Sequence, residues 1–220
     1  MNVTYEGPQD LPDTVPVFPL AGALLLPRGQ MPLNIFEPRY LAMVDAVLAG
    51  SRLIAMIQPR DPDEAGSAPE LYDVGCVGRL VQFAETGDGR YLISLTGVAR
   101  FEILGEINTR EPFRQCRVSF ERFAGDFRAR AGEESVDRAA VLAALRSFTE
   151  ATGLKMDWEG IERTPNEALV NALSMLAPFG GREKQALLEA PDLKSRAEML
   201  VALTEIELAK TGPTTQSTLQ

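Results

Sequence analysis

The chain has 220 residues, 45% of them hydrophobic and 24% charged, and a formal net charge of −9. This composition is typical of a globular protein with one domain or two small ones, and no run of 18 apolar residues predicts a membrane span. Nucleic acid is not an expected partner, because phosphate-backbone affinity depends on clustered Lys and Arg, whereas only four of the 22 basic residues are Lys and the arginines are scattered.

The first residues contain no secretory pattern, since residues 1–7 have neither a basic nor an apolar stretch. We therefore expect a cytoplasmic protein. Gly7, Pro8 and Pro12 predict that residues 1–12 form a flexible leader. Cys76 and Cys116 are expected to be reduced, buried side chains.

The stretch from Val15 to Tyr40 predicts a strand, a Pro/Gly turn and a helix. Pro38 suits the first helical position, which makes Glu37 the N-cap. Phe36 and Leu41 then occupy the two positions of a hydrophobic staple and are expected to be buried against each other. Gly50 is the expected residue just beyond the end of this helix.

Leu24, Leu25 and Leu26 form a run that cannot pack on one face of a strand, because successive side chains alternate. Either one of the three points away from the core, or another element covers it.

The middle of the chain favours a barrel or rolled sheet. Residues 52–57 predict a buried strand, and residues 77–85 and 90–96 predict a hairpin around Gly87 and Gly89, which suit a turn with positive φ. Residues 115–121 alternate between polar and apolar side chains, as in a half-buried strand.

From about Glu133 the apolar period becomes helical. One helix is expected to end near Gly153, a second to begin at a capping box formed by Thr164 and Glu167 with Pro165 as its first residue, a third to cover 181–190, and a fourth to be capped by Asp192. The predicted fold class is α+β: a flexible leader (1–12), a β lobe with one helix (13–125), a helical bundle lobe (126–211) and a flexible tail (212–220).

Much of the usual catalytic chemistry is missing from the sequence. It contains no histidine, which excludes His-based triads, Cys–His pairs and the usual zinc sets, and no Gly-Lys dipeptide, which excludes a Walker A loop. We therefore expect no enzyme, no cofactor and no metal site.

Six short motifs carry a family resemblance: Val15-Pro16-Val17-Phe18-Pro19-Leu20, Leu25-Leu26-Pro27-Arg28-Gly29, Pro32-Leu33, Phe36-Glu37-Pro38-Arg39-Tyr40, Gly75-Cys76-Val77-Gly78-Arg79 and Gly97-Val98-Ala99-Arg100-Phe101. In this order they resemble the LON N-terminal domain, the substrate-recognition module that is found at the front of Lon proteases and also as a free-standing bacterial protein. Asn34 departs from the family pattern, since free-standing members often carry His there. The resemblance implies a PUA-like β-barrel lobe followed by a helical lobe.

The same resemblance implies a non-catalytic, ATP-independent module that binds peptides, unfolded protein segments or a protein partner, with a protease system as one candidate. We expect a groove between the lobes, with nine candidate residues: Phe18, Leu24, Leu25, Leu26, Met31, Phe36, Glu37, Arg39 and Tyr40. The structural alternative is that most of these apolar side chains belong to the core. Two other functions stay open: a small-molecule sensor or regulator with a pocket in the PUA-like lobe, and an assembly subunit that forms a homo-oligomer through its C-terminal helices.

Overall fold

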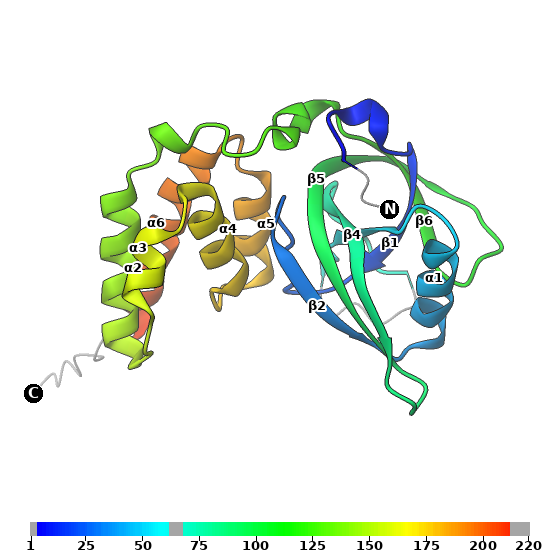
Figure 1. Ribbon diagram of the computed structural model, residues 1–220, viewed down its shortest axis with the longest axis horizontal. Coiled ribbons are helices and arrows are strands. Elements are labelled where there is room, and N and C mark those ends of the chain that lie inside the picture. The colour runs from blue at the N-terminus through cyan, green and yellow to red at the C-terminus, as the bar shows by residue number, and fades with distance from the viewer. Residues whose placement is uncertain (1–3, 62–67, 212–220) are drawn as a thin grey trace, which may run out of the picture.

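A β lobe and a helical lobe lie side by side in the computed structural model, which describes residues 4–61 and 68–211 (Figure 1). The β lobe contains β1 (Thr14–Pro19), β2 (Gln30–Ile35), α1 (Pro38–Leu48), β3 (Leu53–Ile57), β4 (Val74–Glu85), β5 (Tyr91–Ile107) and β6 (Arg114–Ser119). The helical lobe contains α2 (Arg138–Thr152), α3 (Trp158–Arg163), α4 (Asn166–Leu176), α5 (Gly181–Glu189) and α6 (Leu193–Thr211). The expected α+β class and order of lobes are confirmed.

The strands form one sheet in the order β2-β5-β4-β3-β1-β6, and pairing of β5 with β6 closes it into a barrel. Closure depends on the length of β5, whose 17 residues pair with β2 in the first half and with β6 in the second. β1 and β3 are parallel because the chain between them includes β2 and α1. The strand β2 pairs with β5 on one side, and its other side has no neighbouring strand among the described residues.

The predicted hairpin is confirmed between β4 and β5, where Gly87 and Gly89 have φ of 77° and 83°. From Val81 to Glu85 the side chains of β4 are exposed, so the hairpin extends beyond the packed barrel (Figure 1).

The helix α1 begins at Pro38 with Glu37 as its N-cap, and Gly50 follows its C-cap Ala49, as predicted. The Glu37 carboxylate caps no backbone N–H; its Oε2 instead accepts a hydrogen bond from Arg39 Nε at 2.9 Å. At the other end Arg52 has the positive φ, 60°, rather than Gly50, and Arg52 N donates to Val47 O.

The described part of the expected leader is folded. The Asp10 carboxylate accepts hydrogen bonds from the backbone N–H groups of Glu6 and Gly7, and a 3-10 turn follows at Pro8–Asp10. Leu11 is buried in the barrel core, and Arg79 donates to the Tyr5 hydroxyl at 2.8 Å. Residues 4–12 are therefore packed against the β lobe in this structure, where the sequence predicts a flexible leader. The expected tail at 212–220 lies outside the described residues.

Aspartates cap three helices: Asp137 in α2, Asp157 in α3 and Asp192 in α6, which accept from the amides of Ala140, Gly160 and Ser195. Gly153, with φ of 70°, ends α2 as predicted. The capping box expected at Thr164 is wrong. Pro165 precedes α4, the Thr164 hydroxyl donates back to Gly160 O, and the Glu133 carboxylate accepts from Glu167 N at 2.8 Å.

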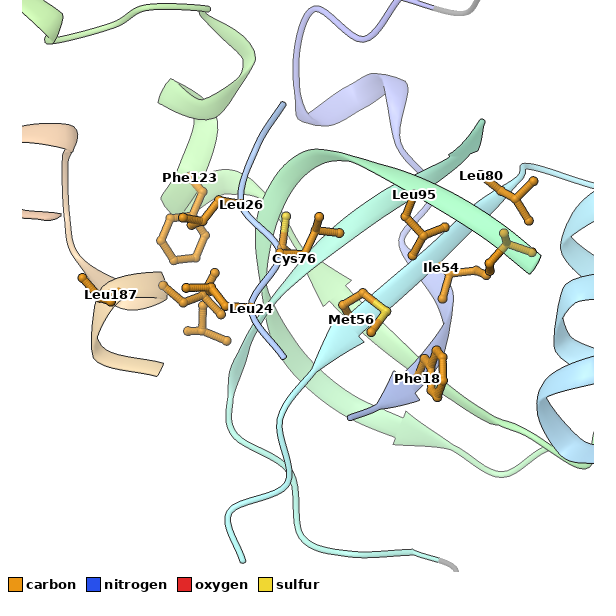
Figure 2. Packing of buried hydrophobic residues seen from close by; sticks show 14 of the residues in the cluster. Phe18, Leu24, Leu26, Ile54, Met56, Cys76, Leu80, Leu95, Phe123 and Leu187 are labelled. Carbon is orange, nitrogen blue, oxygen red and sulfur yellow. The ribbon is translucent and has the colours of Figure 1, made fainter. Parts of the chain in front are cut away.

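The two lobes share one hydrophobic core. A cluster of buried side chains runs from Phe18 in the barrel through Leu26 to Leu187 of the helical lobe (Figure 2). Met43 of α1 and Leu200 of α6 belong to the same cluster. A second cluster, which includes Val15, Phe101 and Phe120, fills the rest of the barrel. Within the described residues no helix is long and apolar enough to cross a membrane.

A buried ion pair lies where the lobes meet. Arg100 of β5 and Asp126 are both nearly inaccessible, and the guanidinium reaches both carboxylate oxygens, with Nη2 to Oδ1 at 2.8 Å and Nε to Oδ2 at 2.9 Å. Arg100 Nη1 also donates to the carbonyls of Leu188 and Ala190 at the end of α5. A cation at this end is favoured by the helix dipole.

Breaking this pair should destabilise the whole chain. We expect Asp126→Ala to lower the free energy of unfolding by about 3–5 kcal/mol, because it leaves a buried guanidinium without its counter-ion. The control Glu102→Ala removes the exposed partner of Arg122 and should cost less than about 1 kcal/mol. Urea unfolding measures both, and equal losses would contradict this assignment.

The Asp192 cap predicts a pH dependence. The hydrogen bond from Ser195 N lowers the pKa of the Asp192 carboxyl, so its stabilisation is present above the unfolded pKa of about 3.9 and is lost as the pH falls through the lower folded value. Asp192→Ala should cost about 1 kcal/mol at pH 7 and clearly less at pH 2.5, as measured by urea unfolding. Glu198→Ala, on the exposed side of the same helix, is the control. If the loss of stability caused by Asp192→Ala is the same at both pH values, the capping role of the Asp192 carboxylate is refuted.

Candidate binding surface

The nine residues expected to line a groove lie in three different surroundings. Phe18 and Tyr40 belong to the barrel core, where their ring centroids are 4.2 Å apart and both side chains are buried. Burial is the main cause of the raised pKa of the Tyr40 phenol. These two side chains are therefore not available to a ligand on the surface of this structure.

Leu24, Leu25 and Leu26 lie at the junction of the lobes and are all buried. Figure 2 shows Leu24 and Leu26 between the barrel and two side chains that belong to later segments, Phe123 and Leu187. The alternative that another element covers this run is therefore confirmed, and the expectation that the three leucines line an open groove is not met. The junction is closed here because α5 and the segment around Phe123 pack on it.

Of the remaining four candidates, Met31 lies near the beginning of β2, and Phe36, Glu37 and Arg39 lie at the start of α1. Phe36 is 60% exposed, so the predicted staple with Leu41 is wrong; the guanidinium of Arg90 lies 5.9 Å from its ring centroid. Met31, Glu37 and Arg39 are half-buried, and Arg39 stacks over the Tyr40 ring at 4.6 Å. Of the nine candidates, Phe36 alone presents a large apolar side chain to solvent.

An apolar groove that the sequence analysis missed lies in the helical lobe. It has a volume of about 420 Å³ and is bounded by α2, α4, α6 and the segments that precede α3 and α5. We call it the helical groove; its lining residues are Val141, Ala144, Leu145, Phe148, Thr149, Leu154, Met156, Leu173, Leu176, Ala177, Pro178, Phe179, Leu200, Val201 and Thr204. Leu176 is 82% exposed and Leu154 56% exposed at its rim.

Both polar side chains of the helical groove are already satisfied. The Thr149 hydroxyl donates to Arg146 O at 2.9 Å, and the Thr204 hydroxyl donates to Leu200 O at 2.7 Å. Each hydroxyl is therefore bonded within its own helix and leaves only its methyl group as apolar surface. A ligand in this groove is recognised by burial of apolar area rather than by hydrogen bonds.

A second hollow, also of about 420 Å³, lies between α4 and the turn that precedes β2. We call it the interlobe hollow. Arg28 pairs here with Glu167, whose other carboxylate oxygen accepts from Arg130 N at 2.8 Å. Arg28 and Arg130 both have φ near 65°, a conformation uncommon outside Gly, and Glu167 binds both segments. Leu176 lines this hollow as well as the helical groove, so the two adjoin.

In the described ranges no group of three Cys, Asp or Glu side chains could hold a metal ion. The Cys76 thiol is buried, and burial raises its pKa far above the usual value. Burial also raises the pKa of the Cys116 thiol, to about 11.

Comparison with known proteins places this geometry in a family. Residues 14–205 match the ATP-dependent protease La (LON) substrate-binding domain. Among curated relatives, Lon protease 2 of Sorangium cellulosum is 31% identical over 208 residues, which is 89% of this chain and 25% of that protein. Lon protease 2 of Myxococcus xanthus is 26% identical over 89% of this chain and 24% of its own length. The chain thus spans about a quarter of the curated relatives it matches.

Two solved structures share the fold. The Lon N-terminal domain protein from Xanthomonas campestris has a TM-score of 0.61 at 21% identity and covers 86% of this chain and 97% of its own. The N-terminal domain of the Mycobacterium avium complex Lon protease has a TM-score of 0.64 at 18% identity, with coverages of 87% and 98%. The chain belongs to the LON substrate-binding domain family.

Proposed function

We propose that this chain binds apolar segments of unfolded polypeptides in the helical groove, without catalysis and without ATP. Membership of a substrate-binding family supports a recognition role. The groove itself supports the proposed binding site. It is an apolar hollow with exposed leucines at its rim and no unsatisfied hydroxyl in its lining. Large exposed apolar side chains that gather around a hollow are typical of a binding surface.

The size and chemistry of the groove favour side chains over a polar small molecule. A volume of about 420 Å³ lies at the small end of the range of ligand pockets, enough for a few apolar side chains. Folded proteins bury most of their large apolar side chains, so unfolded segments are the class of protein that offers them. Recognition by apolar area alone depends little on sequence, which suits a module with many clients.

The small-molecule alternative has less support. The interior of the barrel is filled by side chains of the two core clusters, such as Phe101, Leu95 and Val17. Hollows that include residues of the β lobe lie on its surface or at the junction. A ligand enclosed by the barrel would therefore have to displace core side chains.

The partner that would use this binding is a protein. Because the matching curated relatives are Lon proteases, we propose that the chain delivers its clients to a protease in the cytoplasm. Nucleic acid is an unfavourable ligand, because the net charge of −9 repels a phosphate backbone.

Binding of a permanently unfolded probe, reduced and carboxymethylated lysozyme labelled with a fluorophore, tests this function by anisotropy. Leu176→Ser and Leu154→Ser should each weaken binding by about tenfold, since burying a leucine side chain contributes about 1.5–3 kcal/mol and 1.4 kcal/mol is a factor of ten. Leu104→Ser is the matched control, because Leu104 is 57% exposed on β5 and lies outside the groove.

All three leucines are exposed, so the substitutions should leave the fold intact, which circular dichroism checks. Equal weakening by Leu104→Ser would refute the proposed site, and binding that needs ATP would refute the ATP-independent function. No saturable binding of the probe by the unchanged chain would refute the function.

A further inference from the structure

One strand of the barrel has a side without a neighbour. β2 lies at the open end of the sheet and pairs with β5 alone among the described residues. The hydrogen bonds at its start show which of its backbone groups face outward. Gly97 N donates to Gly29 O at 2.8 Å, and Arg28 N donates to Gly97 O at 2.7 Å, so both backbone groups of Gly97 face the β2 side.

The backbone groups of a strand face its two neighbours alternately, residue by residue. Counting from Gly97, the groups of Leu95, Ile93 and Tyr91 therefore face β2. Their partners in the register are Met31, Leu33 and Ile35, whose backbone groups are used in the β2–β5 ladder. The groups of Gln30, Pro32 and Asn34 consequently face away from β5. Arg90 supports this alternation. It precedes Tyr91, so its backbone groups should face β4, and its carbonyl accepts a hydrogen bond from Thr86 N on that side.

The free edge of β2 thus offers three carbonyls, from Gln30, Pro32 and Asn34, but only two N–H groups. Pro32 lacks its N–H at a position where the ladder with β5 does not need one, which is where a strand tolerates proline. Proline at an edge also limits uncontrolled pairing with other strands. The edge is therefore accessible but partly blocked at its centre.

The surroundings of this edge fit an extended peptide. Gln30, Pro32, Asn34 and the following Phe36 are exposed. A shallow hollow of about 580 Å³ beside them is lined by residues 32–34 of β2 together with 82–84 of β4 and 92–94 of β5. At its other end the strand reaches the interlobe hollow, which Gln30 lines and which adjoins the helical groove at Leu176.

We propose that an extended segment of an unfolded polypeptide adds to the free edge of β2 as a further strand. This inference rests on the proposed function and assigns the client's backbone a site of its own, while the helical groove holds apolar side chains. An extended chain is the ligand that presents donors and acceptors at the spacing of the edge. Strand addition depends on the main chain and so accepts many sequences.

A second folded copy of this chain is a weaker occupant. Six residues of strand span about 20 Å, and pairing two such edges buries far less than the roughly 1,200 Å² of a stable interface. The proline at the centre of both edges would also remove donors from both partners.

Hydrogen exchange followed by NMR tests the edge directly, with reduced and carboxymethylated lysozyme as the probe. In the free chain the amides of Gln30 and Asn34 should exchange fast, whereas those of Met31, Leu33 and Ile35 should be protected. Saturation with the probe should slow exchange at Gln30 and Asn34 by about tenfold or more.

Two substitutions make the test specific to the backbone. Asn34→Pro removes an outward N–H and should weaken probe binding by about three- to tenfold, and clearly more than Asn34→Ala, which keeps the N–H. Pro32→Ala adds the missing donor and should tighten binding by a similar factor. It keeps the prediction testable even if Asn34→Pro fails to fold.

If the probe binds but the amides of Gln30 and Asn34 are not protected from exchange, the proposed peptide site at the edge of β2 is overturned. The proposed function would still stand, because binding would then depend on the helical groove alone. Equal weakening by Asn34→Ala, or no gain from Pro32→Ala, would likewise overturn the site at the edge. Protection that rises with chain concentration without the probe would assign the edge to a second copy. Absence of any probe binding would remove the proposed function itself.

Discussion

The rest of the structure depends on one buried contact between the lobes, that of Arg100 with Asp126. The guanidinium also donates to the carbonyls of Leu188 and Ala190 at the end of α5, and it lies 4.4 Å from the centroid of the Phe123 ring. One side chain of the barrel thus holds the interlobe segment and the helical lobe together. This contact holds the end of α5 and the segment around Phe123 in place over Leu24, Leu25 and Leu26.

Other buried polar groups reinforce this junction. Gln58 at the end of the β3 segment donates to Gly181 O at 3.0 Å, and Asn171 of α4 donates to Pro27 O at 3.2 Å. Arg196 of α6 donates to Asn171 and to Leu187 O, and burial lowers the pKa of its guanidinium to about 10. Buried polar groups of this kind are costly to expose, so the lobes are expected to move as one body. A junction this rigid would present its hollows already formed, which reduces the cost of ordering on binding.

The sequence predicted the features that depend on local signals. Pro38 marks the start of α1, Gly87 and Gly89 mark the hairpin turn, and Asp192 caps α6, because each acts through residues a few positions away. The Leu24–Leu26 run indicated two alternatives, because alternation alone cannot bury all three side chains: one leucine points away from the core, or another element covers it. The structure shows the second.

The features that the sequence did not predict depend on contacts between distant segments. Arg100 looks like a surface residue until Asp126 and α5 are brought to it. The helical groove needs residues from α2, α4 and α6, and Leu176 resembles any apolar helical residue although it is exposed. Phe36 follows the staple pattern, yet it points to solvent beside Arg90. The free edge of β2 follows from the closure of the barrel by β5 and β6, which no local pattern encodes.

The most direct test of the central claim is methyl NMR of the full chain titrated with an unfolded polypeptide and without nucleotide. We expect saturable shifts at the methyl groups of Leu154, Met156, Leu173 and Leu176, with those of Leu104 and of the barrel core at Val17 unchanged. Saturable shifts confined to the barrel, or none at millimolar polypeptide, would contradict the claim.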